Sequence, residues 1–236
     1  MIDHIVASTN IYIENKKRTT FYKRDRDCRL TSSTEIKALL GALYIIAVKK
    51  GNRVNVQELW AKDGTGMIRL RAAFSYTRFL FLLRVLRFDD IRTRKDREKS
   101  DKLAAIRVIY SSFVNNCISN YSLGEFIIID EMLHPFRGRC GFVQYMPLKP
   151  AKYGIKMYAL CDSRTYYTWK FEIYCGKQPD GPYQTSNKPF DIVQRLVDTL
   201  KKSNRNLTID NYYTSYPLAE YLLQNGLTLI GTKKNK

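Results

Sequence analysis

The sequence predicts a mixed α/β protein, with a helical first half followed by a half that forms a mixed sheet. Apolar residues recur at helical spacing up to about residue 120, and from residue 121 onward they gather in short runs typical of strands. Of the 236 residues 44% are hydrophobic, which is enough for a substantial core. We therefore expect a helical region over 1–120 and a sheet region over 121–236.

The first predicted helix begins near Ser32. Ser32 and Glu35 have the spacing of a capping box, in which side chains at the start of a helix bond its free backbone N–H groups. Apolar residues then follow at helical spacing from Ile36 to Ile46. A second helix is expected over 56–62.

A third helix is expected to begin at Ser75, where the segment SYTRFLFLLRVLRF has one apolar face. Its arginines, Arg78 among them, are expected to lie largely off that face. The next segment, 89–102, is dense in charges of both signs and has no apolar period, which predicts a solvated, flexible loop. Helical periodicity returns over 103–118.

Five strands and two helices are predicted in the second half. The strands are expected over 125–130, 154–162, 166–174, 206–210 and 227–231, and the helices begin at Pro189 and Tyr216. The resulting order, βββαβαβ, is that of a ribonuclease H-like sheet, in which the first and fourth strands are neighbours. Right-handed crossovers make these two strands parallel.

Two aspartates follow from this topology as a candidate site. Asp130 closes the first strand and Asp210 the fourth, so both carboxylates are expected at the same end of adjacent strands. Neighbouring strands are about 4.8 Å apart, so we expect the two carboxylates within roughly 5 to 7 Å of each other. Carboxylates held so close favour a bound cation, and oxygen ligands suit Mg²⁺ or Mn²⁺. Such ions support phosphoryl transfer. The alternative is that both residues are ordinary turn acids beside Glu131 and Asn211.

Other titratable residues are less favoured by geometry. Asp162 ends an antiparallel neighbour and is expected at the opposite end of the sheet, as a hairpin residue. Glu131 directly follows Asp130, so alternation should point it away from an ion held there, although a supporting role stays open. His134 is expected to be a packed or surface residue.

The charge of the chain points to a polyanionic partner. Lys and Arg number 40 against 22 Asp and Glu, a net charge of +18, and nucleic acid is the leading candidate. The cations nearest the candidate site are expected to contact DNA, with a structural ion-pair role or a solvated basic face as alternatives. They are Arg137, Arg139, Lys149, Lys152 and Lys156, with Tyr145 and Tyr153 as stacking surfaces.

Several classes of protein are disfavoured. The longest uncharged apolar run, 38–48, is about half of the roughly 20 residues that a membrane span needs, and the start of the chain lacks a secretory signal pattern. The five cysteines are widely spaced and contain no CxxC pair, which favours a reducing compartment over a disulfide or zinc framework. Trp60 and Trp169 are expected in the core.

Three long segments carry a resemblance to a known family. They are IDEMLHPFRGRC (129–140), QYMPLKPAKYGIKMYALCDS (144–163) and TIDNYYTSYPLAEYLLQNGLTLIGT (208–232). These closely resemble the piggyBac transposase family and its domesticated relatives. The likeness extends upstream through SSTEIKALLGALY (32–44), FLLRVLRFDD (81–90) and YSLGEFIIIDE (121–131), so the resemblance covers the chain from about residue 30.

The resemblance implies a DDE/D transposase with a ribonuclease H-like core, which cuts and joins DNA at TTAA sites through hairpin intermediates with two Mg²⁺ ions. Asp130 and Asp210 match the first two catalytic, metal-binding aspartates. The family's third aspartate and its zinc-binding C-terminal domain are expected beyond Lys236. The sheet is therefore expected to be incomplete and the chain inactive alone, with Asp191 and Asp198 as weak candidates for a replacement acid.

The resemblance also implies a nuclear protein whose region 1–120 serves dimerisation and DNA binding, with transposon ends as partners. Three alternatives remain open at this point. The chain acts with an acid from another subunit, or it is a domesticated DNA-binding or dimerising regulator without catalysis, or it is a decaying genomic copy.

Overall fold

The computed structural model describes residues 1–19, 24–49 and 54–232, and these form two compact units. The N-terminal unit contains 1–99 and 103–109, and the C-terminal unit contains 100–102 and 110–236. The expected limits of two functional domains, 1–120 and 121–236, stay a prediction. None of the helices in the described ranges is both long and apolar enough to span a bilayer.

The N-terminal unit is helical, as predicted. Its helices are α1 (Ile2–Thr19), α2 (Ser33–Val48), α3 (Ile68–Ala73), α4 (Tyr76–Val85) and α5 (Arg94–Glu98), with single turns at η1 (Asp25–Asp27) and η3 (Glu58–Trp60). The caps of α2 and α4 are those the sequence indicates: Ser32 Oγ accepts from the Glu35 N–H at 3.3 Å, and Ser75 Oγ from the Arg78 N–H at 3.2 Å. Helices α1 and α3 were not predicted, and the helix expected over 56–62 is one turn.

Arg78 corrects the expectation that the arginines of α4 avoid its apolar face. This residue is 5% exposed and donates from Nε and Nη2 to the two carboxylate oxygens of Glu35, at 2.9 and 2.6 Å. Its guanidinium also bonds the carbonyl oxygens of Asp27, Arg29 and Leu30. An apolar period cannot reveal such a residue, because its burial depends on partners from distant segments.

The segment 89–102 is ordered, so the expectation of a solvated loop was wrong. It contains α5 and two buried acids, Asp89 and Asp101, each 2% exposed. Asp89 accepts hydrogen bonds from Arg94 and Arg97, and Arg97 reaches onward to the carbonyl oxygen of Ala104 at 2.7 Å. Acidic and basic side chains of the segment pair with one another, and these ion pairs stabilise its conformation.

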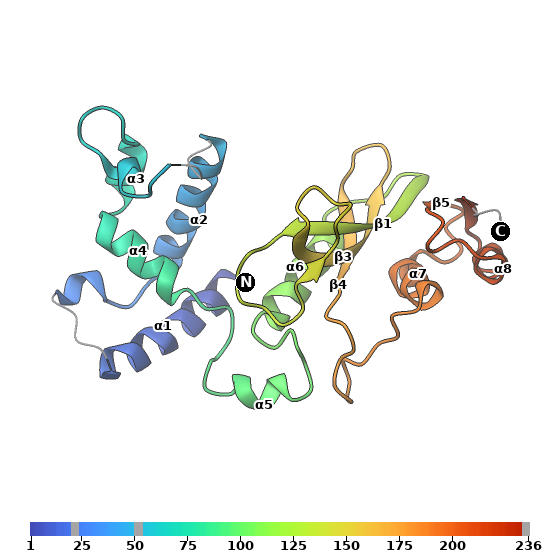
Figure 1. Ribbon diagram of the computed structural model, residues 1–236, viewed down its shortest axis with the longest axis horizontal. Helices are drawn as coiled ribbons and strands as arrows, with labels where there is room; N and C mark the ends of the chain where they lie inside the picture. The colour runs from blue at the N-terminus through green and yellow to red at the C-terminus, as the bar shows by residue number, and fades with distance from the viewer. Residues whose placement is uncertain (20–23, 50–53, 233–236) are drawn as a thin grey trace. The chain divides into compact units, whose positions relative to one another are not determined.

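The C-terminal unit is built on a six-stranded mixed sheet. Its strands are β1 (Phe126–Pro135), β2 (Gln144–Tyr145), β3 (Tyr153–Asp162), β4 (Thr168–Ile173), β5 (Asn206–Ile209) and β6 (Thr228–Gly231). The path through the sheet is β2-β3-β1-β5-β6, with β4 also paired to β3 (Figure 1). Apart from the short β2, this is the predicted ribonuclease H-like order.

The central pair of strands is parallel, as expected. Ile127 lies opposite Leu207 and Ile129 opposite Ile209, and all four are buried. Helices α7 (Pro189–Val197) and α8 (Tyr216–Gln224) follow β4 and β5 and pack into the same apolar cluster. Residues of α6 (Arg107–Ser119) pack on β4, since Tyr110 donates to the Phe171 carbonyl oxygen.

Candidate active site at the carboxyl end of the parallel strands

Three carboxylates come together where the parallel pair ends. β1 and β5 pair as far as Ile129 and Ile209, so Asp130 and Asp210 are the next residues on the two strands. One carboxylate oxygen of each, and one of Glu131, lie within 4.8 Å of one another. The structure thus brings Asp130 and Asp210 together as the sequence predicted. Their roles in catalysis and metal binding stay predictions.

Asp130 does not end its strand, which corrects one detail. β1 continues to Pro135 because β3 pairs with it throughout, from Asp162 opposite Ile127 to Gly154 opposite Pro135. β5 is shorter, so beyond Ile129 the other edge of β1 has no strand beside it among the described residues. The carboxylates lie on this free edge of β1.

The expectation that Glu131 points away from the site was wrong. The register does put the two neighbours on opposite faces, with Asp130 opposite Ala159 and Glu131 opposite Tyr158. At the free edge, however, the described part of the chain places no strand to separate the two faces. The longer glutamate side chain can therefore reach the other two carboxylates around the edge.

Side chains satisfy the backbone of this free edge. The Glu131 N–H donates to Oδ1 of Asp130 at 2.7 Å, and Lys149 Nζ donates to the Glu131 carbonyl oxygen at 3.3 Å. The same ammonium lies 3.8 Å from Oε1 of Glu131. Since open strand edges expose unpaired polar groups, these bonds stabilise β1 beyond β5 and hold the Asp130 carboxylate at the edge.

Asp210 begins a tight turn. Its Oδ1 accepts the Tyr212 N–H at 3.0 Å, and its carbonyl oxygen accepts the Thr214 hydroxyl at 2.7 Å. This is the turn chemistry proposed as the alternative explanation for the residue. It does not exclude a ligand role, because a carboxylate has about four acceptor sites and the turn uses one of them.

A buried tyrosine lies beside the carboxylates. Tyr213 is 1% exposed, and its hydroxyl has no hydrogen-bond partner among the described residues. Burial raises the pKa of Tyr213, and the charges of Glu131 and Asp130 add to the effect. The hydroxyl is therefore protonated at neutral pH and is available as a donor.

The donor set fits a hard divalent cation. Carboxylates this close repel one another unless a cation lies among them, and carboxylate oxygen is the ligand type that Mg²⁺ and Mn²⁺ prefer. The Tyr213 hydroxyl, which has no hydrogen-bond partner among the described residues, would be a further donor near such an ion. Over the described ranges, this is the one cluster of three or more acidic, histidine or cysteine ligands.

The remaining acids lie elsewhere. Asp162 is 3% exposed and accepts backbone N–H groups from Gly124, Arg164 and Thr165, so it is the hairpin residue that was predicted. Asp198 is paired with Lys201 at 2.6 Å. Neither it nor Asp191 joins the carboxylate group, whose third member is Glu131. His134 is exposed, as expected.

The predicted DNA-contacting cations lie around the far end of β1. Arg137 and Arg139 follow the strand, are exposed, and form no ion pair with any carboxylate of the described residues. Lys149 and Lys152 belong to the turn between β2 and β3, where the Lys152 N–H donates to the Lys149 carbonyl oxygen at 2.9 Å. Lys156 lies on β3, opposite Leu133. Contact with DNA stays a prediction for all five.

Tyr145 and Tyr153, expected as stacking surfaces for DNA, lie against each other. They are directly opposite on β2 and β3, their ring centroids are 4.8 Å apart, and they are 58% and 56% exposed. Rings that pack against each other and still face solvent can accept a further planar group.

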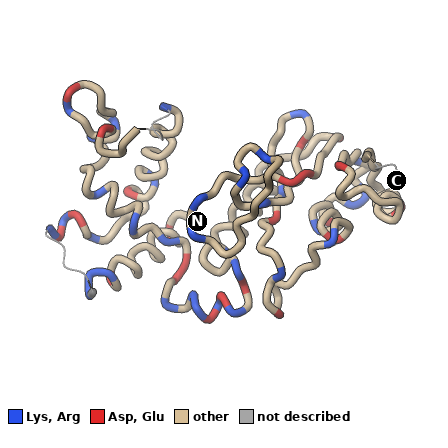
Figure 2. The backbone as a smooth tube through the Cα atoms, in the orientation of Figure 1, with Lys and Arg blue, Asp and Glu red and all other residues tan. Residues whose placement is uncertain are grey.

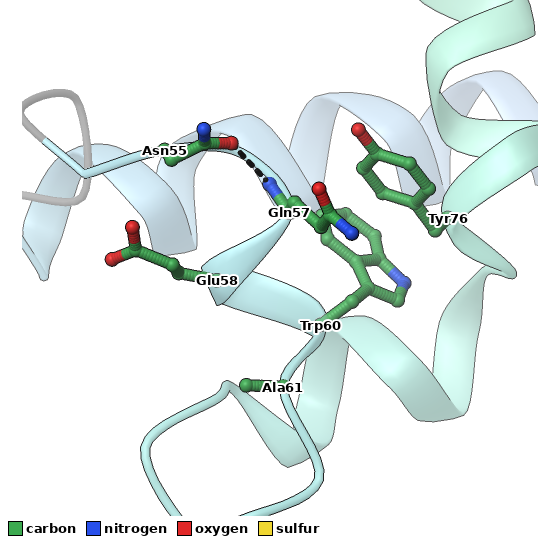
Figure 3. Close-up of a pocket in the computed structure, with 6 residues that line it drawn as sticks. All are labelled: Asn55, Gln57, Glu58, Trp60, Ala61 and Tyr76. Carbon is green, nitrogen blue, oxygen red and sulfur yellow. Dashed lines mark hydrogen bonds between the residues drawn. The ribbon is translucent and has the colours of Figure 1, made fainter.

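A separate pocket in the N-terminal unit lacks comparable chemistry. It has a volume of about 500 Å³ and is lined by Asn55, Gln57, Glu58, Trp60, Ala61 and Tyr76 (Figure 3). Trp60 packs against Phe79 with ring centroids 4.8 Å apart and donates to the Phe74 carbonyl oxygen. Trp60 is therefore partly a core residue, as expected, and Trp169 is buried in the sheet core.

Basic residues are spread over both units rather than confined to one segment (Figure 2). Residues 1–120 hold 24 basic and 12 acidic groups, and 121–236 hold 16 and 10. Along α5 basic and acidic residues alternate closely. The excess positive charge is therefore available outside the paired segment 89–98.

A family model described as Transposase IS4 matches residues 1–236. The chain belongs to the piggyBac-type IS4 transposase family. The match includes the first 30 residues, which the sequence motifs had left uncovered. Membership agrees with the ribonuclease H-like order of the sheet and with the two aspartates at the end of its parallel pair.

Relatives and a solved structure give the same result. The human PiggyBac transposable element-derived protein 3 is 22% identical over 205 residues, which are 85% of this chain and 34% of that protein. The human Chimeric ERCC6-PGBD3 protein is also 22% identical, over 85% of this chain and 19% of its own length. A piggyBac transposase, solved as a synaptic complex with hairpin DNA, is 37% identical with a TM-score of 0.89. The match covers all of this chain and 48% of that one.

Proposed function

We propose that the chain binds DNA and holds one divalent cation among Asp130, Glu131 and Asp210, as part of a site for cutting and joining DNA strands. The observation that carries the proposal is the convergence of these three carboxylates within 4.8 Å. Supporting it, a piggyBac transposase that is 37% identical to the chain was solved in complex with hairpin DNA.

Each group would have a separate task. Asp130, Glu131 and Asp210 would hold Mg²⁺ or Mn²⁺, which when bound activates a water or 3′-hydroxyl and stabilises a leaving oxygen. The Tyr213 hydroxyl would orient a water beside the carboxylates. Lys149, 3.8 Å from Glu131, would offset part of their negative charge and so admit a phosphate.

DNA would be bound chiefly through its phosphates. The net charge of +18 and the exposed guanidiniums of Arg137 and Arg139 support this. Lys149, Lys152 and Lys156 would extend the same surface. Phosphate contacts release counterions, so we expect affinity to fall steeply as salt rises.

The finer features of the family are proposed here too. They comprise transposon ends and TTAA sites as the DNA substrate, a homodimer, and a nuclear location. A DNA-binding or dimerising regulator without catalysis is the second candidate, because the described carboxylates suffice for one ion while the two-ion mechanism needs more ligands.

The test combines binding and cleavage by the 236-residue chain. Binding to a TTAA-containing duplex is followed by fluorescence anisotropy from low to physiological salt, and flat affinity would contradict the proposal. Mn²⁺ binding is followed by its electron paramagnetic resonance signal, with Asp130→Ala as the control. We expect ion binding that Asp130→Ala removes and, because a second ion lacks a protein anchor, no cleavage by the chain alone. Cleavage that depends on Asp130 would favour a complete catalytic site over the regulator.

A further inference from the structure

We propose that Tyr212 is a stacking platform for one unpaired nucleobase of a DNA end, with Lys156 beside it to contact the adjoining phosphate. The inference rests on the proposed function, because it names the form of DNA that the carboxylate site would receive. It assigns a base-stacking role to Tyr212, in the turn after β5, and pairs it with Lys156 on β3.

The turn after β5 fixes where Tyr212 lies. Its backbone N–H donates to Oδ1 of Asp210 at 3.0 Å, so the residue is tied directly to one of the three carboxylates. The next residue, Tyr213, is buried in the core of the C-terminal unit and so anchors the turn. The residue that carries the ring thus belongs to the same turn as Asp210.

The Tyr212 ring is held in place but remains open to solvent. It meets the Tyr213 ring almost at a right angle, with an interplanar angle of 85° and centroids 4.9 Å apart. Edge contacts of this kind are among the favoured aromatic geometries. Tyr212 is nevertheless 45% exposed. A ring that is already oriented loses little conformational entropy when a base stacks on it.

Lys156 adds a cation to this platform. Its ammonium lies 5.5 Å from the centroid of the Tyr212 ring, 5.0 Å from that of Tyr158 and 5.9 Å from that of Tyr174. Aromatic faces attract a cation without neutralising it. No carboxylate of the described residues pairs with this ammonium. The Lys156 ammonium is therefore available to contact an incoming anion.

A nucleotide with an unpaired base matches both features. Its base supplies a planar face for the Tyr212 ring, and its phosphate supplies the anion for Lys156. In an intact duplex each base is already stacked on its neighbours, so the platform would have no base to take. Proteins that bind single-stranded DNA combine cations and aromatic rings in this way, and each stacked base contributes measurably to affinity.

The test compares a blunt duplex with the same duplex carrying a short single-stranded overhang, in which 2-aminopurine replaces each overhang base in turn. Stacking on a tyrosine quenches 2-aminopurine fluorescence. We expect the wild-type chain to quench one overhang position, Tyr212→Phe to retain the quenching and Tyr212→Leu to lose it. Tyr212→Leu should weaken binding of the overhang DNA by between about 5-fold and 150-fold, and leave blunt-duplex binding unchanged.

Two control variants make the outcome decisive. Tyr166→Leu alters an 82% exposed tyrosine on the β3–β4 hairpin and should change neither signal. Tyr153→Leu tests the other aromatic pair. Quenching that survives in Tyr212→Leu, or that disappears only in Tyr153→Leu, would overturn the inference while leaving DNA binding intact. Failure of the wild-type chain to bind either duplex would instead refute the proposed function.

Discussion

Two sets of carboxylates, one in each unit, have opposite environments. In the N-terminal unit the carboxylates of Glu35 and Asp89 form ion pairs with arginine side chains. In the C-terminal unit one carboxylate oxygen each of Asp130, Glu131 and Asp210 lie within 4.8 Å of one another, and the Lys149 ammonium is 3.8 Å from Glu131. Paired acids hold segments together, while acids collected without enough counter-charge leave a place for a cation.

Arginine also lowers the pKa values of the two paired acids, Glu35 and Asp89. Burial opposes ionisation of Glu35, but hydrogen bonds from Arg78 and Thr31 outweigh it and lower the pKa of that carboxyl. The pKa of Asp89 is likewise lowered, as the bonds from Arg94 and Arg97 overcome its burial. These groups are therefore ionised because arginine is already in place.

The largest expected effect is on the buried ion pair of the N-terminal unit. Arg78→Ala should lower the free energy of unfolding of that unit by about 3 to 5 kcal/mol, because it leaves the Glu35 carboxylate without its main partner. Urea denaturation measures the loss. Arg92→Ala, which removes an exposed pair with Asp90, is the matched control and should change little. Equal effects of the two variants would show that the buried Arg78–Glu35 pair contributes no more to stability than the exposed Arg92–Asp90 pair.

A pair of isosteric substitutions tests the comparison by the sign of its effect. Asp89→Asn should destabilise by about 2 to 3 kcal/mol, since one amide oxygen cannot satisfy two guanidiniums. Asp130→Asn should leave stability unchanged or slightly raised at low ionic strength without divalent ions, because it relieves repulsion among the three carboxylates. The measurement is urea denaturation of both variants in one buffer containing a chelator. A large loss for Asp130→Asn would mean that its charge is paired in the free protein.

Added metal should then stabilise only the C-terminal unit. At a free Mn²⁺ concentration about ten times Kd, the gain in unfolding free energy should be about 1.4 kcal/mol. Asp210→Asn should abolish that gain, whereas Asp198→Asn, at an acid outside the group, should keep it. Thermal denaturation with and without Mn²⁺ measures the gain in each variant. A gain that survives in Asp210→Asn would place the ion elsewhere.

The smallest expected effect is on the stability of the protein at low pH. Three backbone N–H donors, from Gly124, Thr165 and Arg164, lower the pKa of Asp162 from 3.8 to about 2. The stabilisation from this group is thus complete above pH 3.8 and is lost as the pH falls toward 2. In Asp162→Asn we expect a shallower loss of stability across that window, followed by circular dichroism. An unchanged acid profile would show that the hairpin bonds do not depend on the charge.

Local patterns were enough for most of the elements and for half of the site. Ser32 and Ser75 mark true helix starts because a cap acts within one turn of its helix. Asp130 and Asp210 could be paired from the order of strands alone, because parallel neighbours align their carboxyl ends.

What the sequence could not show depends on contacts between distant segments. The sequence predicts that Arg78 lies off the apolar face. Its burial depends on Glu35 and three carbonyl groups from a distant segment. Segment 89–102 is read as a loop until Asp89 is buried between two arginines. Glu131 is misjudged because alternation assumes a strand on both sides, and the early end of β5 removes one of them.

The pairing of Ile129 with Ile209 also has a consequence for how the chain folds. The hairpin of β3 and β4 closes across a short turn, whereas β1 and β5 must close a loop that includes both of those strands and α7. Contacts so distant in sequence carry a large entropy cost and form slowly. We therefore expect the carboxylates to meet after the nearby hairpin has formed. Metal uptake should consequently lag behind the early gain of helical signal in a refolding experiment.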